Sequence, residues 1–342
     1  MDLGQLFMIG FDGLEVDNDH PVVEDIVHHG LGGVILFARN VDGRRQNIRS
    51  PEQLKKLTSD LQGYAVTPLL IAVDQEGGQV CRLRESDGFP PTVSARSLGQ
   101  GDDPEMTAHH GALLAQGLKD CGVNFNLAPV VDLDRNPHNP VIGRFERSYG
   151  ADPAKVATHA ARFIAEHHKR NISCCLKHFP GHGSSSQDSH LGFTDVTGLW
   201  HEDELMPYDI LIKQGCVDAV MSAHVVNRRL DDSGLPATLS SKMLGGVLRE
   251  RLGFDGPVIS DDLQMRAITD KWPLERAVIA ALLAGVDLLV IGNNIKRDRE
   301  AFSSAMDALN RAITNGEISK DRIRESLRRV SRLKSRIINK IS

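Results

Sequence analysis

Residues 176–190, LKHFPGHGSSSQDSH, concentrate side chains capable of acid–base or nucleophilic chemistry. Three histidines, one lysine and one aspartate occur here, and the glycines and serines between them leave the backbone free to bend. The segment follows residues 172–176, a short apolar run typical of a buried strand. A lone loop histidine is more commonly a hydrogen-bonding group. Five titratable groups on one flexible loop after a buried strand nevertheless predict a functional site.

The composition indicates a soluble globular protein with a large core, since 41% of the 342 residues are apolar and 25% are charged. A net charge of −5 argues against nucleic acid or an anionic membrane as the main partner. The five cysteines lack a CxxC spacing, which predicts reduced, mostly buried thiols. No export signal or membrane-spanning run is recognisable. We expect a cytoplasmic protein, although a processed exported chain with an added methionine would look the same.

Short apolar runs alternate with amphipathic segments along almost the whole chain, a pattern that predicts strands alternating with helices. The expected strands are residues 6–11, 33–38, 69–74, 124–131, 172–177, 219–224, 257–261 and 286–292. The expected helices are residues 21–29, 50–65, 103–120, 152–169, 202–214, 240–252, 273–284 and 297–313, followed by a basic amphipathic helix at 319–338.

Strands that alternate with helices are parallel, and eight is the number that closes a barrel. Neither GxGxxG nor GxxxxGK[ST], which would favour an open nucleotide-binding sheet, occurs in the chain. No repeat or Pro- or Ser-rich linker divides the sequence. It therefore predicts an α/β protein, a single-domain (β/α)8 TIM barrel over residues 1–342, with the extra C-terminal helix at about 319–338 packed on its outside or base.

Charged residues follow five consecutive predicted strands, at the end where such barrels place their sites. They are Asp74, Glu76 and Arg82; Asp132, Asp134, Arg144 and Arg147; Lys177 and His178; His224; and Asp261 and Asp262. Helix capping could account for Asp262 but does not call for lysine, arginine and histidine at the same rim.

Such a rim suits a sugar, because carboxylates and arginines pair with vicinal hydroxyls and a carboxylate can attack an anomeric carbon. A glycosidase needs a nucleophile or base and a proton donor. Asp261 could be the nucleophile or base, and Glu76 and His190 are both candidates for the proton donor.

Five motifs carry a family resemblance: VDQEGGQVCRLR (73–84), VIGRFERSYGADP (141–153), CLKHFPGHGSSSQDSH (175–190), MSAHV (221–225) and VISDDLQM (258–265). Together they resemble family 3 glycoside hydrolases, in the branch of single-barrel β-N-acetylglucosaminidases that act on cell-wall fragments. The resemblance implies a retaining exo-enzyme that removes terminal non-reducing N-acetylglucosamine from peptidoglycan-derived fragments. The expected partner is thus a small carbohydrate, the expected state a monomer or weak oligomer, and no cofactor or metal is expected.

The resemblance also implies roles for individual residues. Asp261 matches the nucleophile that forms a covalent glycosyl-enzyme, His190 the general acid/base, and Asp188 its dyad partner. The positions that match sugar-holding residues, with His224 the least certain in role, are Asp74, Arg82, Arg147, Lys177, His178 and His224. The chemistry agrees, since a histidine with an ordinary pKa near 6.5 exchanges protons around neutrality and a neighbouring aspartate can orient it. A flexible loop would let the dyad move in with substrate, and His182 is expected to hold the PGHG turn.

The sequence also departs from the family pattern. The segment IGRFERSYG is two residues longer than the usual IGNRSFG, so Arg144 competes with Arg147 for the sugar; we favour Arg147 because RSYGADP continues the match. The SDD motif disfavours the two-domain β-glucosidase branch, which has SDW. The alternatives are a related family 3 β-glycosidase or phosphorylase of different sugar preference, a metal-dependent hydrolase using the loop histidines and Asp188, and a non-catalytic sugar-binding protein.

Overall fold

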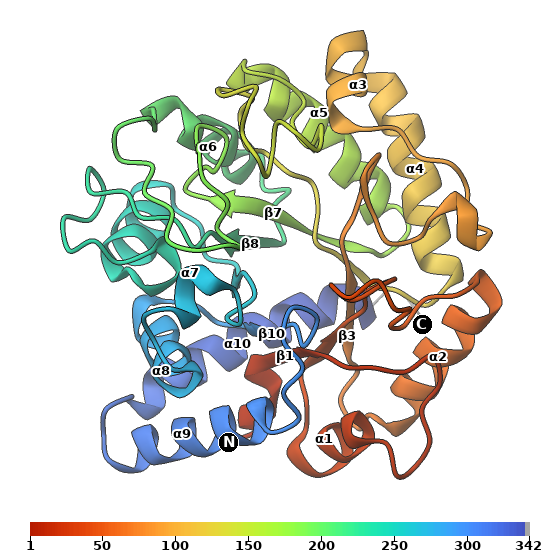
Figure 1. Cartoon of the computed structure of the whole chain (residues 1–342), viewed down its shortest axis with the longest axis vertical. Helices are drawn as coiled ribbons and strands as arrows, with labels where there is room; N and C mark the ends of the chain where they lie inside the picture. Colours follow the sequence, from red (N-terminus) through yellow and green to blue (C-terminus); the bar gives the residue numbers. More distant parts are fainter. Residues whose placement is uncertain (339–342) are drawn as a thin grey trace.

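Eight parallel strands form a nearly closed barrel with helices around it (Figure 1). The structure is a computed structural model that describes residues 1–338. The strands are β1 (Phe7–Gly10), β2 (Gly33–Ile35), β3 (Leu70–Val73), β6 (Phe125–Asn126), β7 (Ser173–Phe179), β8 (Ala219–Ser222), β9 (Val258–Ser260) and β10 (Leu289–Ile291). They pair in the order β10-β1-β2-β3-β6-β7-β8-β9, and a bridge from Ile259 to Leu288 joins the two ends. The predicted (β/α)8 barrel is confirmed.

The outer helices occupy the predicted connections between the strands. They are α1 (Pro21–His29), α2 (Pro51–Tyr64), α4 (Pro104–Asp120), α5 (Pro153–His168), α6 (Met206–Lys213), the π-helix η5 (Lys242–Arg251), α8 (Leu274–Ala284) and α9 (Ala301–Thr314). Several begin with proline after a capping side chain, which is why their starts were predictable. For example, Ser50 Oγ accepts from the Gln53 N–H at 3.2 Å, and Asp152 Oδ1 accepts from the Lys155 N–H at 2.9 Å.

Some elements differ from the prediction. The helix expected at 202–214 is divided into a 3-10 turn, η3 (Glu202–Leu205), and α6, because Pro207 lacks the N–H that would continue one helix. The helix expected at 240–252 is wound as the π-helix η5 rather than an α-helix. Elements that the periodicity did not indicate are the hairpin β4 (Gln75–Gly77) and β5 (Val80–Cys81), helices α3 (Ala95–Gly101) and α7 (Arg266–Thr269), and the 3-10 turns η1 (Leu3–Leu6), η2 (Glu85–Asp87) and η4 (Ala237–Leu239).

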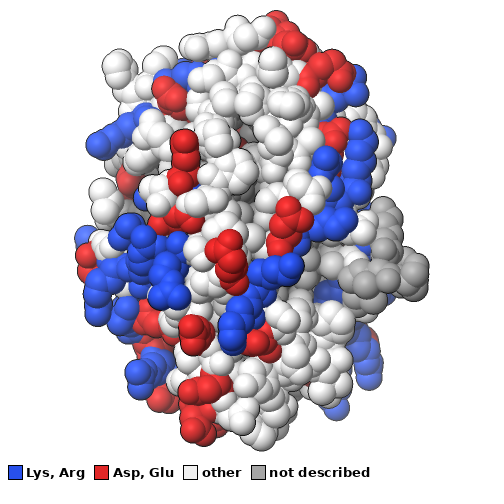
Figure 2. All heavy atoms as spheres, turned by 90° about the vertical axis from the view of Figure 1, so that its right-hand side faces the viewer, with Lys and Arg blue, Asp and Glu red and all other residues white. Residues whose placement is uncertain are grey.

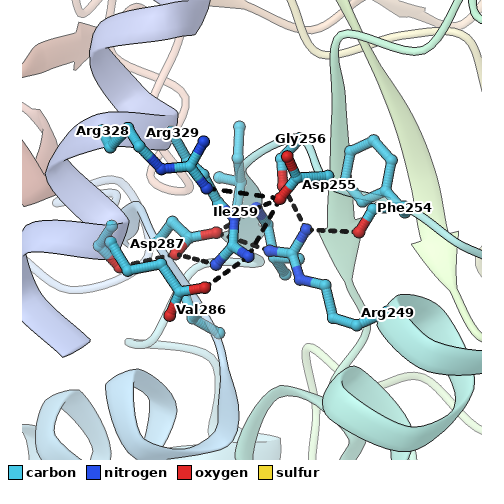
Figure 3. Close-up of polar contacts among 12 residues, drawn as sticks. Arg249, Phe254, Asp255, Gly256, Ile259, Val286, Asp287, Arg328 and Arg329 are labelled. Carbon is cyan, nitrogen blue, oxygen red and sulfur yellow. Dashed lines mark hydrogen bonds and ion pairs between the residues drawn. The ribbon is translucent and has the colours of Figure 1, made fainter. Parts of the chain in front are cut away.

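The last described helix, α10 (Lys320–Ile338), covers the base of the barrel. Val330, Leu333 and Ile337 belong to the same buried apolar cluster as barrel residues such as Met8 and Phe125. Polar contacts also fasten α10 to residues that precede the strands, and Figure 3 shows the group around the fully buried Asp287. Since α10 occupies the amino-terminal ends of the strands, the carboxyl ends remain open for a site.

Asp287 receives hydrogen bonds from both the barrel and α10 (Figure 3). Its Oδ2 lies 2.7 Å from Arg249 Nη2, and its Oδ1 accepts from Ser326 Oγ at 2.6 Å and from Arg322 Nη1 at 3.2 Å. Arg329 Nη1 lies 3.5 Å from the same oxygen. A buried carboxylate needs such partners to stay charged, and here they join three separate parts of the chain.

The surface and the thiols agree with the composition. On the face in Figure 2, small groups of acidic and basic side chains lie among uncharged residues. All five cysteines are free, and all except Cys216 are buried, as predicted. Within residues 1–338, no helix has both the length and the apolar character needed to cross a membrane.

Candidate active site at the carboxyl ends of the strands

A buried ion cluster lies where β3 and β7 end. Lys177 Nζ is 2.8 Å from Asp74 Oδ1 and 2.7 Å from Glu76 Oε1, and Arg82 Nη2 is 2.8 Å from Asp74 Oδ2. Burial would raise the pKa of Asp74, but the charges of Lys177 and Arg82 hold it well below its usual range. Burial would likewise lower the pKa of Lys177, but the carboxylates of Asp74 and Glu76 raise it. The cluster is therefore charged at neutral pH and offers fixed donors and acceptors to a polar ligand.

Arg147, rather than Arg144, joins this cluster. Its Nε and Nη2 form a two-point contact with the Glu76 carboxylate at 2.8 and 2.7 Å. Arg144 is exposed, with its guanidinium 5.6 Å from the centre of the Phe145 ring. Of the two arginines left open by the sequence, only Arg147 is placed by the fold among the charged residues of the rim.

His178 has a fixed orientation between Arg147 and Asp132. Arg147 Nη2 lies 3.3 Å from His178 Nε2 and can only donate, so Nε2 accepts. Nδ1 therefore carries the hydrogen and donates to Asp132 Oδ2 at 2.7 Å. Asp132 also accepts from the backbone N–H groups of His178 and His182, the latter at 2.8 Å. Burial would raise the pKa of Asp132, but His178 and these donors lower it.

The predicted His–Asp pair is formed on the loop after β7. His190 Nδ1 lies 2.8 Å from Asp188 Oδ1, and the His190 side chain is 49% exposed. Burial would lower the pKa of His190, but the hydrogen bond to Asp188 and the negative charge of Asp261 raise it. The pair thus has one ring nitrogen held by a carboxylate and a ring that is half exposed.

Ser189, between the two dyad residues, anchors their loop to the barrel. Its side chain is buried, and Oγ lies 3.1 Å from His182 Nε2. Its carbonyl oxygen accepts from the N–H of Ala267, in α7, at 3.3 Å. His182 is itself buried, which lowers its pKa to about 4 and keeps the ring neutral. His182 thus holds both the turn after β7 and the dyad loop.

Asp261 follows β9 directly and is oriented by backbone groups. Its N–H donates to the Ser222 carbonyl at 3.1 Å, and its Oδ1 accepts from the Asp262 N–H at 2.8 Å. Burial would raise the pKa of Asp261, but the surrounding histidines and the Asp262 N–H hold it below its ordinary value. Asp261 is thus an ionised carboxylate at neutral pH. Asp262 Oδ1 accepts from the Gln264 N–H at 3.0 Å and so holds the turn before α7, whose own N-cap is Met265; helix capping does not explain Asp262.

His224 lies at the same rim but is fully engaged by the protein. Nδ1 is 2.8 Å from Thr238 Oγ1, and Nε2 is 2.9 Å from the carbonyl oxygen of Asp262. Both ring nitrogens of His224 thus contact protein atoms, as do those of His178, and the partners of His224 are a hydroxyl and a backbone carbonyl.

Two acids were seen at the rim in the sequence, Glu76 as a candidate proton donor and Asp132 without an assigned role. Glu76 pairs with Arg147 and Lys177, and Asp132 orients His178 and the turn at His182. In the sequence, their position just after predicted strands was the feature that pointed to the site. Among residues 1–338, no group of three or more His, Cys, Asp or Glu side chains is arranged to hold a metal ion.

Comparison with known proteins identifies the family. Residues 1–333 match the glycosyl hydrolase family 3 N-terminal domain. The chain belongs to this family. It is 37% identical over 301 residues to a beta-hexosaminidase of Alkalilimnicola ehrlichii, covering 86% of this chain and 82% of that one. It is 39% identical over 292 residues to a beta-hexosaminidase of Tolumonas auensis, covering 84% of this chain and 82% of that one.

Solved structures of the family have the same architecture. A family 3 beta-N-acetylglucosaminidase from a Paenibacillus species superimposes with a TM-score of 0.89 at 36% identity, over 98% of this chain and 62% of that chain. This chain therefore spans less than two thirds of the Paenibacillus protein. A beta-N-acetylhexosaminidase from Beutenbergia cavernae gives a TM-score of 0.87 at 26% identity, over 98% and 97% of the two chains. The predicted family resemblance is confirmed, and the chain is a glycoside hydrolase.

Proposed function

We propose that the chain is a retaining exo-β-N-acetylglucosaminidase that removes terminal non-reducing N-acetylglucosamine. The observation that carries this proposal is that the Asp261 carboxylate follows β9 and the half-exposed His190–Asp188 pair lies on the loop after β7, so both are at the carboxyl end of the barrel strands. A nucleophilic carboxylate and a proton donor at one site are what double displacement at an anomeric carbon requires. The names of the relatives and the five sequence motifs favour N-acetylglucosamine as the sugar.

The ion cluster is proposed to hold the terminal sugar. Lys177 has three ammonium hydrogens and forms ion pairs with Asp74 and Glu76. Arg82 Nε is a buried donor without a partner among residues 1–338, which suits a sugar hydroxyl. Asp74 can accept further hydrogen bonds beside its two cationic contacts. These groups would fix the sugar ring so that C1 faces Asp261.

The proposed hydrolysis proceeds in two displacement steps. In the first, an oxygen of Asp261 attacks C1 and forms a glycosyl ester while protonated His190 gives its Nε2 hydrogen to the departing glycosidic oxygen. Asp188, on Nδ1, stabilises the charged ring before the transfer and orients it throughout. In the second, neutral His190 takes a proton from water, the resulting oxygen attacks C1, and the Asp261 carboxylate leaves. Two inversions give net retention.

Substrate origin is part of the same proposal. Peptidoglycan-derived fragments are the expected source, because the motifs resemble the branch that acts on cell-wall fragments. A small carbohydrate partner fits an open rim that carries both acids and bases rather than a field of one charge sign.

The test is a panel of aryl β-glycosides that differ at C2, assayed with and without phosphate. Turnover of the N-acetylglucosaminide, with little turnover of the glucoside, supports the sugar assignment. Asp261→Ala should abolish turnover, and near wild-type activity in that variant would overturn the mechanism. Formation of a sugar 1-phosphate in phosphate buffer would replace hydrolysis by phosphorolysis. Release of sugar from peptidoglycan fragments by the same protein checks the substrate source.

A further inference from the structure

His224 donates to the backbone next to Asp261. Nε2 lies 2.9 Å from the carbonyl oxygen of Asp262, and a carbonyl oxygen only accepts, so Nε2 carries a hydrogen. Burial lowers the pKa of His224 and so favours the neutral ring. In that form Nδ1 accepts the hydroxyl hydrogen of Thr238, 2.8 Å away. Neither ring nitrogen is left for a sugar hydroxyl.

Thr238 is held in turn by Ser222. Ser222 Oγ lies 3.0 Å from Thr238 Oγ1, and each hydroxyl has one hydrogen to give. The shortest contacts therefore form a directed chain in which Ser222 donates to Thr238 and Thr238 donates to His224. The Ser222 carbonyl also accepts from the Asp261 N–H at 3.1 Å. This series of hydrogen bonds therefore begins and ends next to the backbone of Asp261 and Asp262. Hydrogen bonds in series of this kind strengthen one another.

This series of hydrogen bonds ends at Asp262, which other groups also hold in place. The Asp262 carbonyl oxygen accepts from His224, and Asp262 Oδ1 accepts from the N–H groups of Gln264 and Gly292 at 3.0 and 2.9 Å. The Asp262 N–H then holds Oδ1 of Asp261 at 2.8 Å. Within residues 1–338, Oδ2 of Asp261 has no hydrogen-bond partner, so it is the oxygen left to attack.

We propose that His224 is a positioning residue for the Asp261 carboxylate, acting through the backbone of Asp262, and that it does not bind the sugar. Thr238 is the second part of the same device, because it fixes the ring of His224. The inference rests on the proposed function, in which Asp261 is the nucleophile. A carboxylate displaced by about 1 Å loses on the order of 100-fold in rate while the bound sugar is unaffected.

The test separates positioning from sugar binding. For His224→Ala, kcat on an aryl β-N-acetylglucosaminide should fall by about 10- to 100-fold, while the competitive inhibition constant of N-acetylglucosamine changes less than about 2-fold. His224→Gln, which can place an amide N–H near the position of Nε2–H, should recover part of kcat. A rise in the inhibition constant that matches the loss of kcat/KM would make His224 a sugar ligand and overturn the proposal.

Thr238→Val tests the same device without altering the histidine. It should lower kcat by about 3- to 10-fold, again with an unchanged inhibition constant, and an unchanged kcat would contradict the proposal. The matched control is Thr58→Val, on helix α2. It removes a buried hydroxyl that donates to the Cys121 carbonyl at 2.7 Å. That variant should keep wild-type kcat. Should His224→Ala fail to fold, Thr238→Val decides alone.

The outcomes also separate this inference from the proposed function. A wild-type protein that hydrolyses no aryl β-N-acetylglucosaminide, or an Asp261→Ala variant that remains active, refutes the proposed function. An active wild type with an inactive Asp261→Ala variant, but with full kcat in Thr238→Val and His224→Ala, refutes only the positioning role.

Discussion

Asp188 accepts two hydrogen bonds from His190, one from ring Nδ1 at 2.8 Å and one from the backbone N–H at 2.9 Å. Both go to the same oxygen, Oδ1, so the orientation of the ring is tied to the turn of the backbone. The internal geometry of the dyad therefore needs no distant residue. Its position at the rim depends on how the loop is attached, and Ser189 makes two of the attaching contacts.

The pH profile should report the dyad. In the proposed mechanism the protonated ring is the acid of the first step, so kcat/KM for a poor leaving group should be full below the pKa of His190 and lost as pH rises through it. Asp188 raises this pKa, and Asp188→Asn should therefore move the alkaline limb to lower pH. Profiles of kcat/KM over about pH 5–9 measure the shift. An alkaline limb that stays in place in Asp188→Asn assigns the acid to another group.

The leaving group should decide how much His190 matters. For His190→Ala, kcat/KM on a disaccharide should fall by about 100-fold or more, because a sugar alcohol needs a proton as it leaves. A nitrophenyl leaving group departs readily as an anion, so its loss should be smaller. Equal losses on the two substrates would argue against an acid role for His190.

Loosening the dyad loop should mimic a milder loss of the acid. Ser189→Ala removes the contact with His182 Nε2 and should reduce activity on a disaccharide about 5- to 20-fold, with less effect on a nitrophenyl substrate. Ser186→Ala, at an exposed position of the same loop, is the matched control and should behave as wild type. If both variants keep full activity, the Ser189 contact does not position the dyad.

The ion cluster should be important for stability as well as for binding. Glu76→Ala leaves the buried charges of Lys177 and Arg147 without one partner and should cost about 3–5 kcal/mol in the free energy of unfolding. Urea unfolding measures this loss. The pKa of Glu76 is lowered, so its stabilisation is present at neutral pH and is lost as pH falls through the folded-state pKa. Lys56→Ala, which removes an exposed ion pair with Asp60, is the control and should leave the midpoint unchanged.

The base of the barrel should affect stability without affecting chemistry. Asp287→Ala leaves three arginines around an empty position and should destabilise the fold by about 3–5 kcal/mol. Kinetic constants per folded molecule should be unchanged, because the change is at the opposite end of the strands. Asp255→Ala, an exposed acid that contacts Arg329 and Arg332, should have a much smaller effect on unfolding. A selective loss of kcat in Asp287→Ala would show that base and site are coupled.

The strands and most helix starts could be predicted because they depend on local patterns. Apolar runs mark strands buried on both faces, and a capping side chain before proline marks a helix start. The π-helix η5 could not be foreseen, because apolar periodicity does not distinguish its winding from that of an α-helix.

The side-chain contacts within the site could not be predicted for a different reason. Motif matches indicated Asp74, Arg147 and His190 by position, but the contacts that give each residue its orientation join distant segments. Glu76 meets Arg147 across 71 residues, and Asp132 meets His178 across 46. The contacts of His224 depend on Thr238 in a short turn that the sequence did not indicate.

The contact between Lys334 Nζ and Gln5 Oε1, at 2.6 Å, joins residues 329 positions apart in sequence. Helix α10 therefore completes a wall begun by residues that are synthesised much earlier, next to β1. Until residues 320–338 have been synthesised, the apolar residues at the base of the barrel have no cover. We expect the nascent barrel to depend on chaperones at this stage, and a chain truncated before residue 320 to aggregate through its exposed base.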